Sequence, residues 1–260
     1  MARTRGVTPH LFAQWDRIAR RIRGNKRLVI FLDFDGTLAR IAPLPGNVRL
    51  EGTTREVLRK LAAHRTVTLA VISGRQRAEL QRCVGMSKVK YLGLYGWENN
   101  GKKRVPFPDR LALARTLVSL QADLPSYPGV WIEPKWNSFS IHLKGASGEV
   151  QRQVRQRVNE RVNPLRETLR VIENLRDLEV APVSIGDKGV AVRKFLNLPS
   201  RRAALPIYFG DDYSDEPAFA AARRGISILV GKRRTTRAQF CLRGPAEVTE
   251  ALSRMEEMIR

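Results

Sequence analysis

The segment Leu28-Val-Ile-Phe-Leu-Asp33-Phe-Asp35-Gly36-Thr37-Leu38 decides the fold of this chain. Five apolar residues run directly into two aspartates that are one residue apart. A continuous apolar run of this kind is typical of a strand buried on both faces of a parallel sheet. Ligand sites in open parallel sheets lie just beyond the carboxyl ends of the strands. The segment therefore predicts a polar site at Asp33 and Asp35.

The charges of the two aspartates need a partner. Strand side chains alternate between faces, so Asp33 and Asp35 are expected to point the same way and to repel each other. A shared proton or a divalent cation would relieve that repulsion. Gly36 permits a sharp turn, and the Thr37 hydroxyl can donate a hydrogen bond to an anion. The alternative is a purely structural one, in which the strand ends in an Asx turn and one aspartate caps a helix.

Other apolar runs predict further strands of the same sheet. Residues 66–72 predict a second buried strand, followed by Ser73-Gly74-Arg75, and the helical spacing around residues 53–63 makes a right-handed crossover unit. Residues 91–95 are expected to form a short third strand. The Ser73 hydroxyl should then lie at the same sheet edge as Asp33.

A second acidic cluster follows the apolar run 206–210, in the sequence Asp211-Asp212-Tyr213-Ser214-Asp215-Glu216. Four carboxylates exceed what a helix N-terminus needs for capping, and in so basic a chain they favour a divalent cation. Lys188 stands at the start of a predicted helix, where a cation is unfavourable for the helix dipole. An anionic partner is therefore expected beside it; an exposed lysine is the alternative.

Composition limits the possible partners. The 260 residues include 47 Lys and Arg against 25 Asp and Glu, so the net charge is +22. Such charge attracts nucleic acid, anionic lipid and anionic substrates. The arginines are scattered, however, and no nucleic-acid-binding module is evident, so we interpret the charge as solvated surface and do not expect a nucleic-acid partner.

Neither a membrane span nor a cysteine site is expected. No apolar run reaches the roughly eighteen residues of a membrane span, and the N-terminal residues lack the apolar core of a secretory signal. Cys83 and Cys241 are far apart and support neither a zinc site nor a disulfide framework. These features predict a cytoplasmic protein without membrane association.

The pattern changes character between residues 102 and 182. We expect an α/β protein whose doubly wound, mostly parallel-sheet (Rossmann-like) core comprises residues 1–101 and 183–260, with an inserted α+β cap domain at 102–182. Within the cap, residues 130–135 and 138–143 alternate like half-buried antiparallel strands. The remaining cap elements are expected to be helices at 109–120 and 147–162 and strands at 170–173 and 177–182.

The residues expected at the sheet edge suit phosphoryl transfer. Acids from two strands would form the oxygen-rich site that Mg²⁺ prefers, while Ser73, Lys188 and backbone amides would hold a phosphate. Asp33, at the strand end, is placed to attack phosphorus and form an aspartyl-phosphate. Asp35, just past it, is placed to protonate the leaving oxygen and then to activate water.

Four motifs, in this order and spacing, resemble the haloacid dehalogenase superfamily of phosphotransferases over about residues 28–252: DFDGT, SGR, DKG and GDDxxDE. The insertion between SGR and DKG resembles the branch with a type-two α/β cap. The resemblance implies that Asp33 is the nucleophile and Asp35 the acid/base, and that Mg²⁺ is held by Asp33, the Asp35 carbonyl and Asp211. It also implies phosphate contacts from Thr37, Ser73, Gly74 and Lys188, with Asp212 and Asp215 supporting the metal.

Within that branch, the closest resemblance is to the trehalose-6-phosphate phosphatase family. It is carried by Val71-Ile-Ser-Gly-Arg75, Glu133-Pro-Lys135 with Ser138, Ser140 and His142, Glu179-Val-Ala-Pro182, Gly210-Asp-Asp-Tyr-Ser-Asp-Glu216 and Thr236-Arg-Ala-Gln-Phe-Cys-Leu242. In that family the cap residues that match Glu133, Lys135 and Glu179 hold sugar hydroxyls. The resemblance extends sugar binding to Arg75 and His142. A surface ion pair is the alternative for each cap residue.

Two departures from the family pattern bear on the substrate. Tyr95-Gly96 stands where the family usually has His-Gly, and Leu143-Lys144 stands where an aromatic residue and an arginine are usual. The expected substrate is trehalose 6-phosphate. The alternatives are another glycosyl phosphate, of the sucrose phosphate or mannosyl-phosphoglycerate type, and a basic nucleic-acid-binding protein with a vestigial phosphatase core.

Overall fold

The computed structural model describes residues 4–5, 8–41, 48–98, 105–135, 137–174, 177–232 and 235–259. The chain divides into two compact units, a core unit of Met1–Gly101 with Asp187–Arg260 and a cap unit of Lys102–Gly186. The second boundary thus falls four residues later than the sequence indicated. The reason is the turn after Pro182, which bonds to the cap unit: the Val183 amide donates to the Thr168 carbonyl (2.8 Å).

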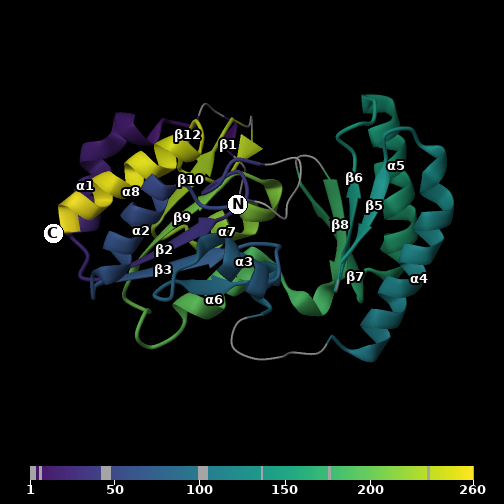
Figure 1. Cartoon of the computed structure of the whole chain (residues 1–260), viewed down its shortest axis with the longest axis horizontal. Helices are drawn as coiled ribbons and strands as arrows, with labels where there is room; N and C mark the ends of the chain where they lie inside the picture. The colour runs from purple at the N-terminus through teal and green to yellow at the C-terminus, as the bar shows by residue number, and fades with distance from the viewer. Residues whose placement is uncertain are drawn as a thin grey trace. The chain divides into compact units, whose positions relative to one another are not determined.

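The core unit is built on a six-stranded sheet in which every neighbouring pair of strands is parallel. The strand order is β12-β10-β9-β2-β3-β4 (Figure 1). Across the sheet, the bounds are Phe240–Leu242 (β12), Ile226–Val230 (β10), Leu205–Gly210 (β9), Leu28–Asp33 (β2), Val67–Ile72 (β3) and Lys90–Leu92 (β4). A separate two-residue pair joins Thr4–Arg5 (β1) to Thr235–Thr236 (β11).

Helices cover both faces of this sheet, and the alternation along β2 shows how. Ile30 packs in a core cluster with helices α1, α2, α3 and α8. Phe31 packs in a second cluster with α6 and α7. The bounds are Trp15–Arg23 (α1), Gly52–Ala63 (α2), Arg77–Val84 (α3), Lys188–Leu196 (α6), Glu216–Ala221 (α7) and Pro245–Ile259 (α8). Helices on both faces confirm the expected doubly wound core. They also explain why β2 is apolar throughout, since both of its faces are covered.

The third predicted strand is shorter than expected. β4 ends at Leu92, and the following residues form a 3-10 turn, Leu94–Gly96, with Leu94 and Tyr95 at positive φ. The Tyr95 amide donates to the Ser73 carbonyl and the Leu94 amide donates to the Arg75 carbonyl, each at 2.9 Å. The chain turns here because its amides bond to the loop after β3 rather than continuing the ladder.

The cap unit is an antiparallel sheet of order β5-β6-β8-β7 covered on one face by two helices (Figure 1). The Ile141 face of the sheet packs on both helices, as the alternating pattern predicted. The bounds are Phe107–Asp123 (α4), Trp131–Pro134 (β5), Phe139–His142 (β6), Gly148–Val162 (α5), Leu169–Glu173 (β7) and Asp177–Pro182 (β8). Among the described residues, no helix combines the length and apolar character needed to cross a bilayer.

Replacement of Phe31 by alanine should destabilise the core unit by about 3–5 kcal/mol. The ring is fully buried and lies against Phe195 and Tyr208, with centroids 5.3 and 6.1 Å away, so truncation leaves a cavity between the sheet and α6. Urea unfolding followed by circular dichroism measures the change. Leu198→Ala, at a side chain that is 45% exposed, is the matched control and should stay within about 0.5 kcal/mol of the unsubstituted protein; equal effects would contradict this packing.

Candidate active site

Three neighbouring parallel strands end at one edge of the core sheet. Asp33 is the last residue of β2 and pairs with Ile72, the last residue of β3, while β9 ends beside it at Gly210. The residues that directly follow these strands are therefore brought to the same edge, and they include Ser73 and Asp211. Parallel pairing in this register is what assembles the site, as the sequence predicted for these residues.

Lys188 connects the two acidic segments. Its Nζ atom donates to Asp33 Oδ1 and to Asp215 Oδ1, both at 2.8 Å. The Tyr208 hydroxyl donates to the same Asp215 oxygen (2.7 Å), and the Asp212 amide donates to Asp215 Oδ2 (2.9 Å). Lys188 is 3% exposed and Asp215 is fully buried. Both carboxylate oxygens of Asp215 thus accept hydrogen bonds. In Asp33, Oδ1 is the oxygen that accepts the hydrogen bond from Lys188.

This network holds more negative than positive charge, and the pKa values of its groups are shifted accordingly. Burial alone lowers the pKa of Lys188, but Asp215 and Asp33 more than offset this, so the pKa of Lys188 is raised and the ammonium form is secured. Burial raises the pKa of Asp33 well above its usual range; Lys188 opposes the shift, while Asp215 and Asp211 add to it. One ammonium therefore does not offset the negative charge collected around it.

The carboxylates suit a divalent cation. Asp33, Asp211 and Asp215 each place a carboxylate oxygen within 4.8 Å of the other two, and all three residues are buried. Burial, and then the charges of Asp215 and Asp212, raise the pKa of Asp211 from 3.8 to about 7. A buried cluster of oxygen donors with surplus negative charge is a chemistry that fits a hard cation such as Mg²⁺.

Two glycines allow these acids to approach the backbone. Gly36 has φ +85°, and a Cβ atom at this position would lie 2.1 Å from Asp211 Oδ2. A Cβ atom on Gly210 would lie 2.3 Å from the Asp215 carboxyl carbon. In the same turn as Gly36, the Thr37 hydroxyl donates to Asp211 Oδ1 (3.1 Å). The DFDGT turn therefore packs directly on the second acidic segment.

Asp35 has a different partner from Asp33. Arg75 clamps its carboxylate through two hydrogen bonds, from Nε to Oδ2 and from Nη2 to Oδ1, both at 2.7 Å. Arg75 also pairs with Glu79. β2 ends at Asp33, so strand alternation does not set the direction of the Asp35 side chain; Arg75 sets it instead. The guanidinium for which the resemblance implied sugar binding thus contacts two carboxylates of the core unit.

The SGR loop is held by its own backbone and by Tyr95. The buried Ser73 hydroxyl accepts a hydrogen bond from the Arg75 amide (3.1 Å). Gly74 lies against the Tyr95 ring, because a Cβ atom on Gly74 would be 2.8 Å from the Tyr95 hydroxyl oxygen. The tyrosine that replaces the usual histidine is thus packed against the predicted phosphate-binding loop, at a φ of 57°.

Some residues of the second acidic cluster shape the loop. The Asp212 side chain accepts from the Tyr213 amide (2.6 Å) and forms a capping box with Asp215. The buried Glu216 carboxylate accepts from the Thr236 hydroxyl (2.7 Å) and from a neighbouring backbone amide. Sequence reasoning missed Tyr208; its only signal was a hydroxyl within a fully buried strand, where such a group needs a partner.

The predicted sugar-binding residues of the cap unit share one face of its sheet. Glu133 pairs with Ser140, and Ser140 pairs with Glu179 on the next strand. The Ser138 hydroxyl donates to Glu179 Oε1 (2.6 Å), and Lys135 Nζ lies 3.5 Å from Glu179 Oε2. Glu179 is 2% exposed, which is unlike a solvated surface ion pair.

The carboxylates on this face stabilise the charged form of Lys135. Burial alone lowers the pKa of Lys135, but Glu179, Glu133 and Asp177 outweigh it, so the pKa of Lys135 is raised. His142 Nε2 lies 2.9 Å from Glu133 Oε2. Lys135 therefore carries its charge at neutral pH beside two carboxylates, and the group offers both donors and acceptors for hydroxyls.

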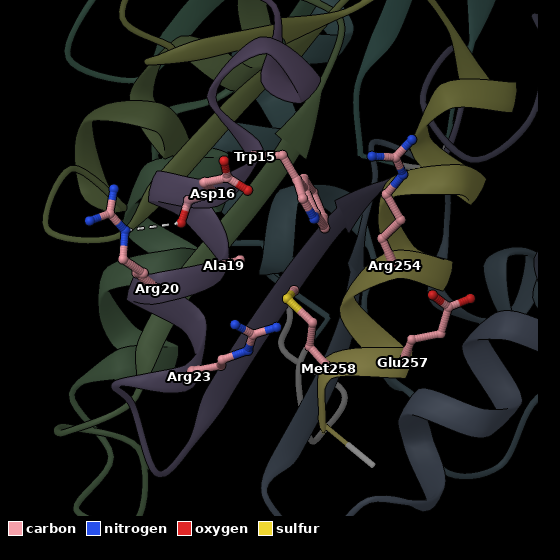
Figure 2. A pocket seen from close by; sticks show the side chains of 8 residues that line it. All are labelled: Trp15, Asp16, Ala19, Arg20, Arg23, Arg254, Glu257 and Met258. Carbon is pink, nitrogen blue, oxygen red and sulfur yellow. Dashed lines mark hydrogen bonds between the residues drawn. The ribbon is translucent and has the colours of Figure 1, made fainter.

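A cavity elsewhere on the core unit is unrelated to these residues. It has a volume of about 590 Å³ and lies between α1 and α8, with Trp15, Arg20, Arg254 and Met258 among its lining residues (Figure 2). None of the predicted catalytic, phosphate-binding or sugar-binding residues lines it. The predicted site residues therefore lie outside this cavity.

The fold and the site together define the class of the protein. A parallel sheet with paired aspartates after its central strand, a buried lysine, a second acidic segment and an inserted cap unit is the arrangement of haloacid dehalogenase-like phosphatases. Among solved structures, the C-terminal domain of the trehalose-6-phosphate phosphatase of C. albicans superposes with a TM-score of 0.81, at 19% identity, over 97% of this chain and 100% of that one.

The sequence comparisons identify the family. The chain belongs to the trehalose-phosphatase family, because the model of that family, described as trehalose-phosphatase, matches residues 31–246. It is 30% identical to a trehalose 6-phosphate phosphatase of Zea mays, over 95% of this chain and 74% of that protein. It is 33% identical to a trehalose-phosphate phosphatase of Mycobacterium marinum, over 90% and 62%. The protein is accordingly a phosphoric monoester hydrolase.

Replacement of Gly36 by alanine should damage the site. The added methyl group would meet Asp211 at a φ that L-residues rarely adopt, so we expect a loss of about 1–3 kcal/mol in the free energy of unfolding and at least a roughly tenfold loss of kcat/KM. Thermal unfolding measures the change in stability, and the rate of phosphate release from a phosphate monoester measures the change in kcat/KM.

Gly52→Ala is the matched control for this variant. Gly52 begins α2 and a Cβ atom there would have nothing within 4 Å, so alanine should be neutral or slightly stabilising. A Gly36→Ala protein as stable and active as the Gly52→Ala protein would contradict the close packing of the DFDGT turn on Asp211.

Proposed function

We propose that this hydrolase converts trehalose 6-phosphate to trehalose and phosphate, with Mg²⁺ as cofactor and an aspartyl-phosphate intermediate. The observation that carries the proposal is the buried Asp33–Lys188–Asp215 network beside Asp211. The network holds the Asp33 carboxylate at the end of β2 beside the ammonium of Lys188. That positive charge can offset negative charge on a phosphoryl group. The names of the relatives in two kingdoms support the choice of sugar phosphate.

Asp33 is the proposed nucleophile. A carboxylate oxygen of Asp33 forms a bond to phosphorus while the bond from phosphorus to the sugar oxygen breaks, and the sugar oxygen takes a proton from Asp35. Water then attacks the phosphorus of the acyl phosphate, Asp35 takes one of its protons, and inorganic phosphate and free Asp33 result. Lys188 keeps Asp33 oriented, and the Ser73 hydroxyl is the proposed donor to a phosphoryl oxygen. The Thr37 hydroxyl, which donates to Asp211, would contact phosphate only after leaving that bond.

The proposed role of Arg75 in the reaction is to orient Asp35, which differs from sugar binding. Its two hydrogen bonds hold the Asp35 carboxylate, and a planar guanidinium fixes both the position and the plane of a carboxylate that it clamps. Arg75 thereby orients the proposed acid/base between the two chemical steps, and Glu79 orients Arg75 in turn.

The proposed metal ligands are those that the family resemblance implies, and the hydrogen bonding supports a secondary place for Asp215. Asp33, Asp211 and the Asp35 carbonyl would hold Mg²⁺, while Asp215, whose two oxygens already accept three hydrogen bonds, and Asp212 would support the ligands. When bound, Mg²⁺ offsets the charge of carboxylates and phosphoryl oxygens, so that one anion can approach another.

The proposed sugar contacts lie on the cap unit. Glu133, Lys135, His142 and Glu179 present carboxylate, ammonium and imidazole groups on a single sheet face. A ligand rich in hydroxyls requires donors and acceptors side by side, and a buried, charged pair such as Lys135 with Glu179 strengthens each hydrogen bond that it makes.

Replacement of Asp33 by asparagine should lower the rate of phosphate release from trehalose 6-phosphate by several powers of ten. The nucleophilic oxygen is lost, while the side chain keeps its size and shape. Phosphate release with Mg²⁺, and with EDTA in its place, measures this. Asp16→Asn, at an exposed aspartate of α1, is the matched control and should keep full activity. Substantial turnover by Asp33→Asn would refute the proposed nucleophile.

The choice of sugar is tested separately with a substrate panel. We expect kcat/KM for trehalose 6-phosphate to exceed that for sucrose 6-phosphate, glucose 6-phosphate and a mannosyl-phosphoglycerate. A higher value for any of the other three would reassign the substrate and leave the chemistry in place.

The raised pKa of Asp211 predicts how stability depends on pH and cation. Without cation, folded Asp211 holds a proton between pH 3.8 and about 7, where the unfolded chain has released it, so its contribution to the free energy of unfolding falls as the pH rises through that window. Because Mg²⁺ competes with this proton, it should raise the melting temperature more at about pH 8 than at about pH 5.

Thermal unfolding in EDTA and in Mg²⁺ measures this effect. Asp211→Asn, which cannot titrate at this position, should show smaller differences both between the two pH values and between the two conditions. An equal Mg²⁺ shift at both pH values in the unsubstituted protein would contradict the expected competition.

A further inference from the structure

The polar face of the cap sheet carries two rows of side chains. The strand register places Glu133, Ser140 and Glu179 in one row. It places Trp131 and His142 in the next row, with Asp177 on the third strand. Residues two apart on a strand share a face and lie roughly 7 Å apart along it, a spacing comparable to the width of one pyranose ring.

Trp131 is one of several exposed large apolar residues of this unit, and it is the one that lies on the polar face of the cap sheet. It begins β5 and is 55% exposed, although an indole is among the side chains that gain most from burial. One face of its ring is stacked on His142, with centroids 3.7 Å apart and planes at 17°. The stack covers one face only, which leaves a flat apolar surface beside the polar groups of the first row.

The indole is held in place by a chain of contacts. His142 Nε2 lies 2.9 Å from Glu133 Oε2, and His142 Nδ1 lies 3.8 Å from Asp177 Oδ2. The imidazole is thus fixed between two carboxylates, and the imidazole in turn fixes the plane of Trp131. A pre-oriented ring loses little conformational entropy when a ligand packs on it, which is how binding surfaces differ from incidental exposed residues.

We propose that Trp131 is the stacking platform for one sugar ring of a disaccharide phosphate and that it selects two-ring substrates over one-ring substrates. The inference rests on the proposed function and assigns one residue of its sugar site. The apolar C–H face of a pyranose packs on the indole face that His142 leaves open, while Glu133, two residues along β5, lies beside it to bond hydroxyls at the ring edge. The first row, with Lys135 and Glu179, takes the other ring.

The experiment compares substrates with two, one and no sugar rings. Trp131→Ala should lower kcat/KM for trehalose 6-phosphate by roughly 10- to 100-fold, chiefly through KM. It should leave kcat/KM for glucose 6-phosphate and p-nitrophenyl phosphate within about twofold, because those substrates have no second sugar ring to pack on the indole. Phe107→Ala, at a 66% exposed ring on α4 of the same unit, is the matched control and should change none of the three.

Two further variants separate stacking from bulk and from folding. Trp131→Phe keeps a flat ring and should retain most of the disaccharide activity, whereas Trp131→Leu keeps apolar volume without a flat face and should resemble Trp131→Ala. Equal activity of the Phe and Leu variants would overturn the stacking role. A parallel loss on p-nitrophenyl phosphate would also overturn it, because that would mark a structural role.

The failure of this inference is distinguishable from the failure of the proposed function. If the unsubstituted enzyme hydrolyses p-nitrophenyl phosphate but not trehalose 6-phosphate, the proposed substrate is wrong. If it hydrolyses trehalose 6-phosphate and Trp131→Ala does so with unchanged kcat/KM, the substrate stands and the platform is wrong.

Discussion

The buried ammonium of Lys188 is the interaction on which the rest of the core depends. Removing an ammonium ion from water costs several kcal/mol even after relaxation, and the start of a helix adds an unfavourable dipole. Asp33 and Asp215 supply the compensating charge at 2.8 Å each. Loss of both partners would leave the buried ammonium unpaired. The lysine thus links the end of β2 and the loop after β9 to the start of α6.

This linkage explains why the acidic segments can be so close. Three carboxylates gathered in a buried space repel one another, and the raised pKa of Asp211 records the surplus. The lysine offsets part of the repulsion permanently. The remainder is uncompensated negative charge, which the proposed Mg²⁺ would offset.

The two units follow different physical rules. The core sheet is apolar on both faces and places its chemistry at strand ends, where backbone direction converges. The cap sheet is apolar on one face and places polar groups on the other, where the strand register determines which side chains are neighbours. Under the proposed function, sugar recognition on the cap face and phosphoryl transfer at the strand ends could vary independently, because they depend on different sheets.

The sequence by itself determined the elements and the residue types of the site. The buried strand before Asp33, the acidic run after β9 and the polar face of the cap were predictable because apolar periodicity and motif spacing are local properties. Tertiary structure decided which groups meet. The clamp of Arg75 on Asp35, the bond from Tyr208 to Asp215 and the early end of β4 at Leu92 depend on side chains and loops that only folding brings together. No local pattern encodes those distances, because they are set by strand register and by competition for hydrogen-bond partners.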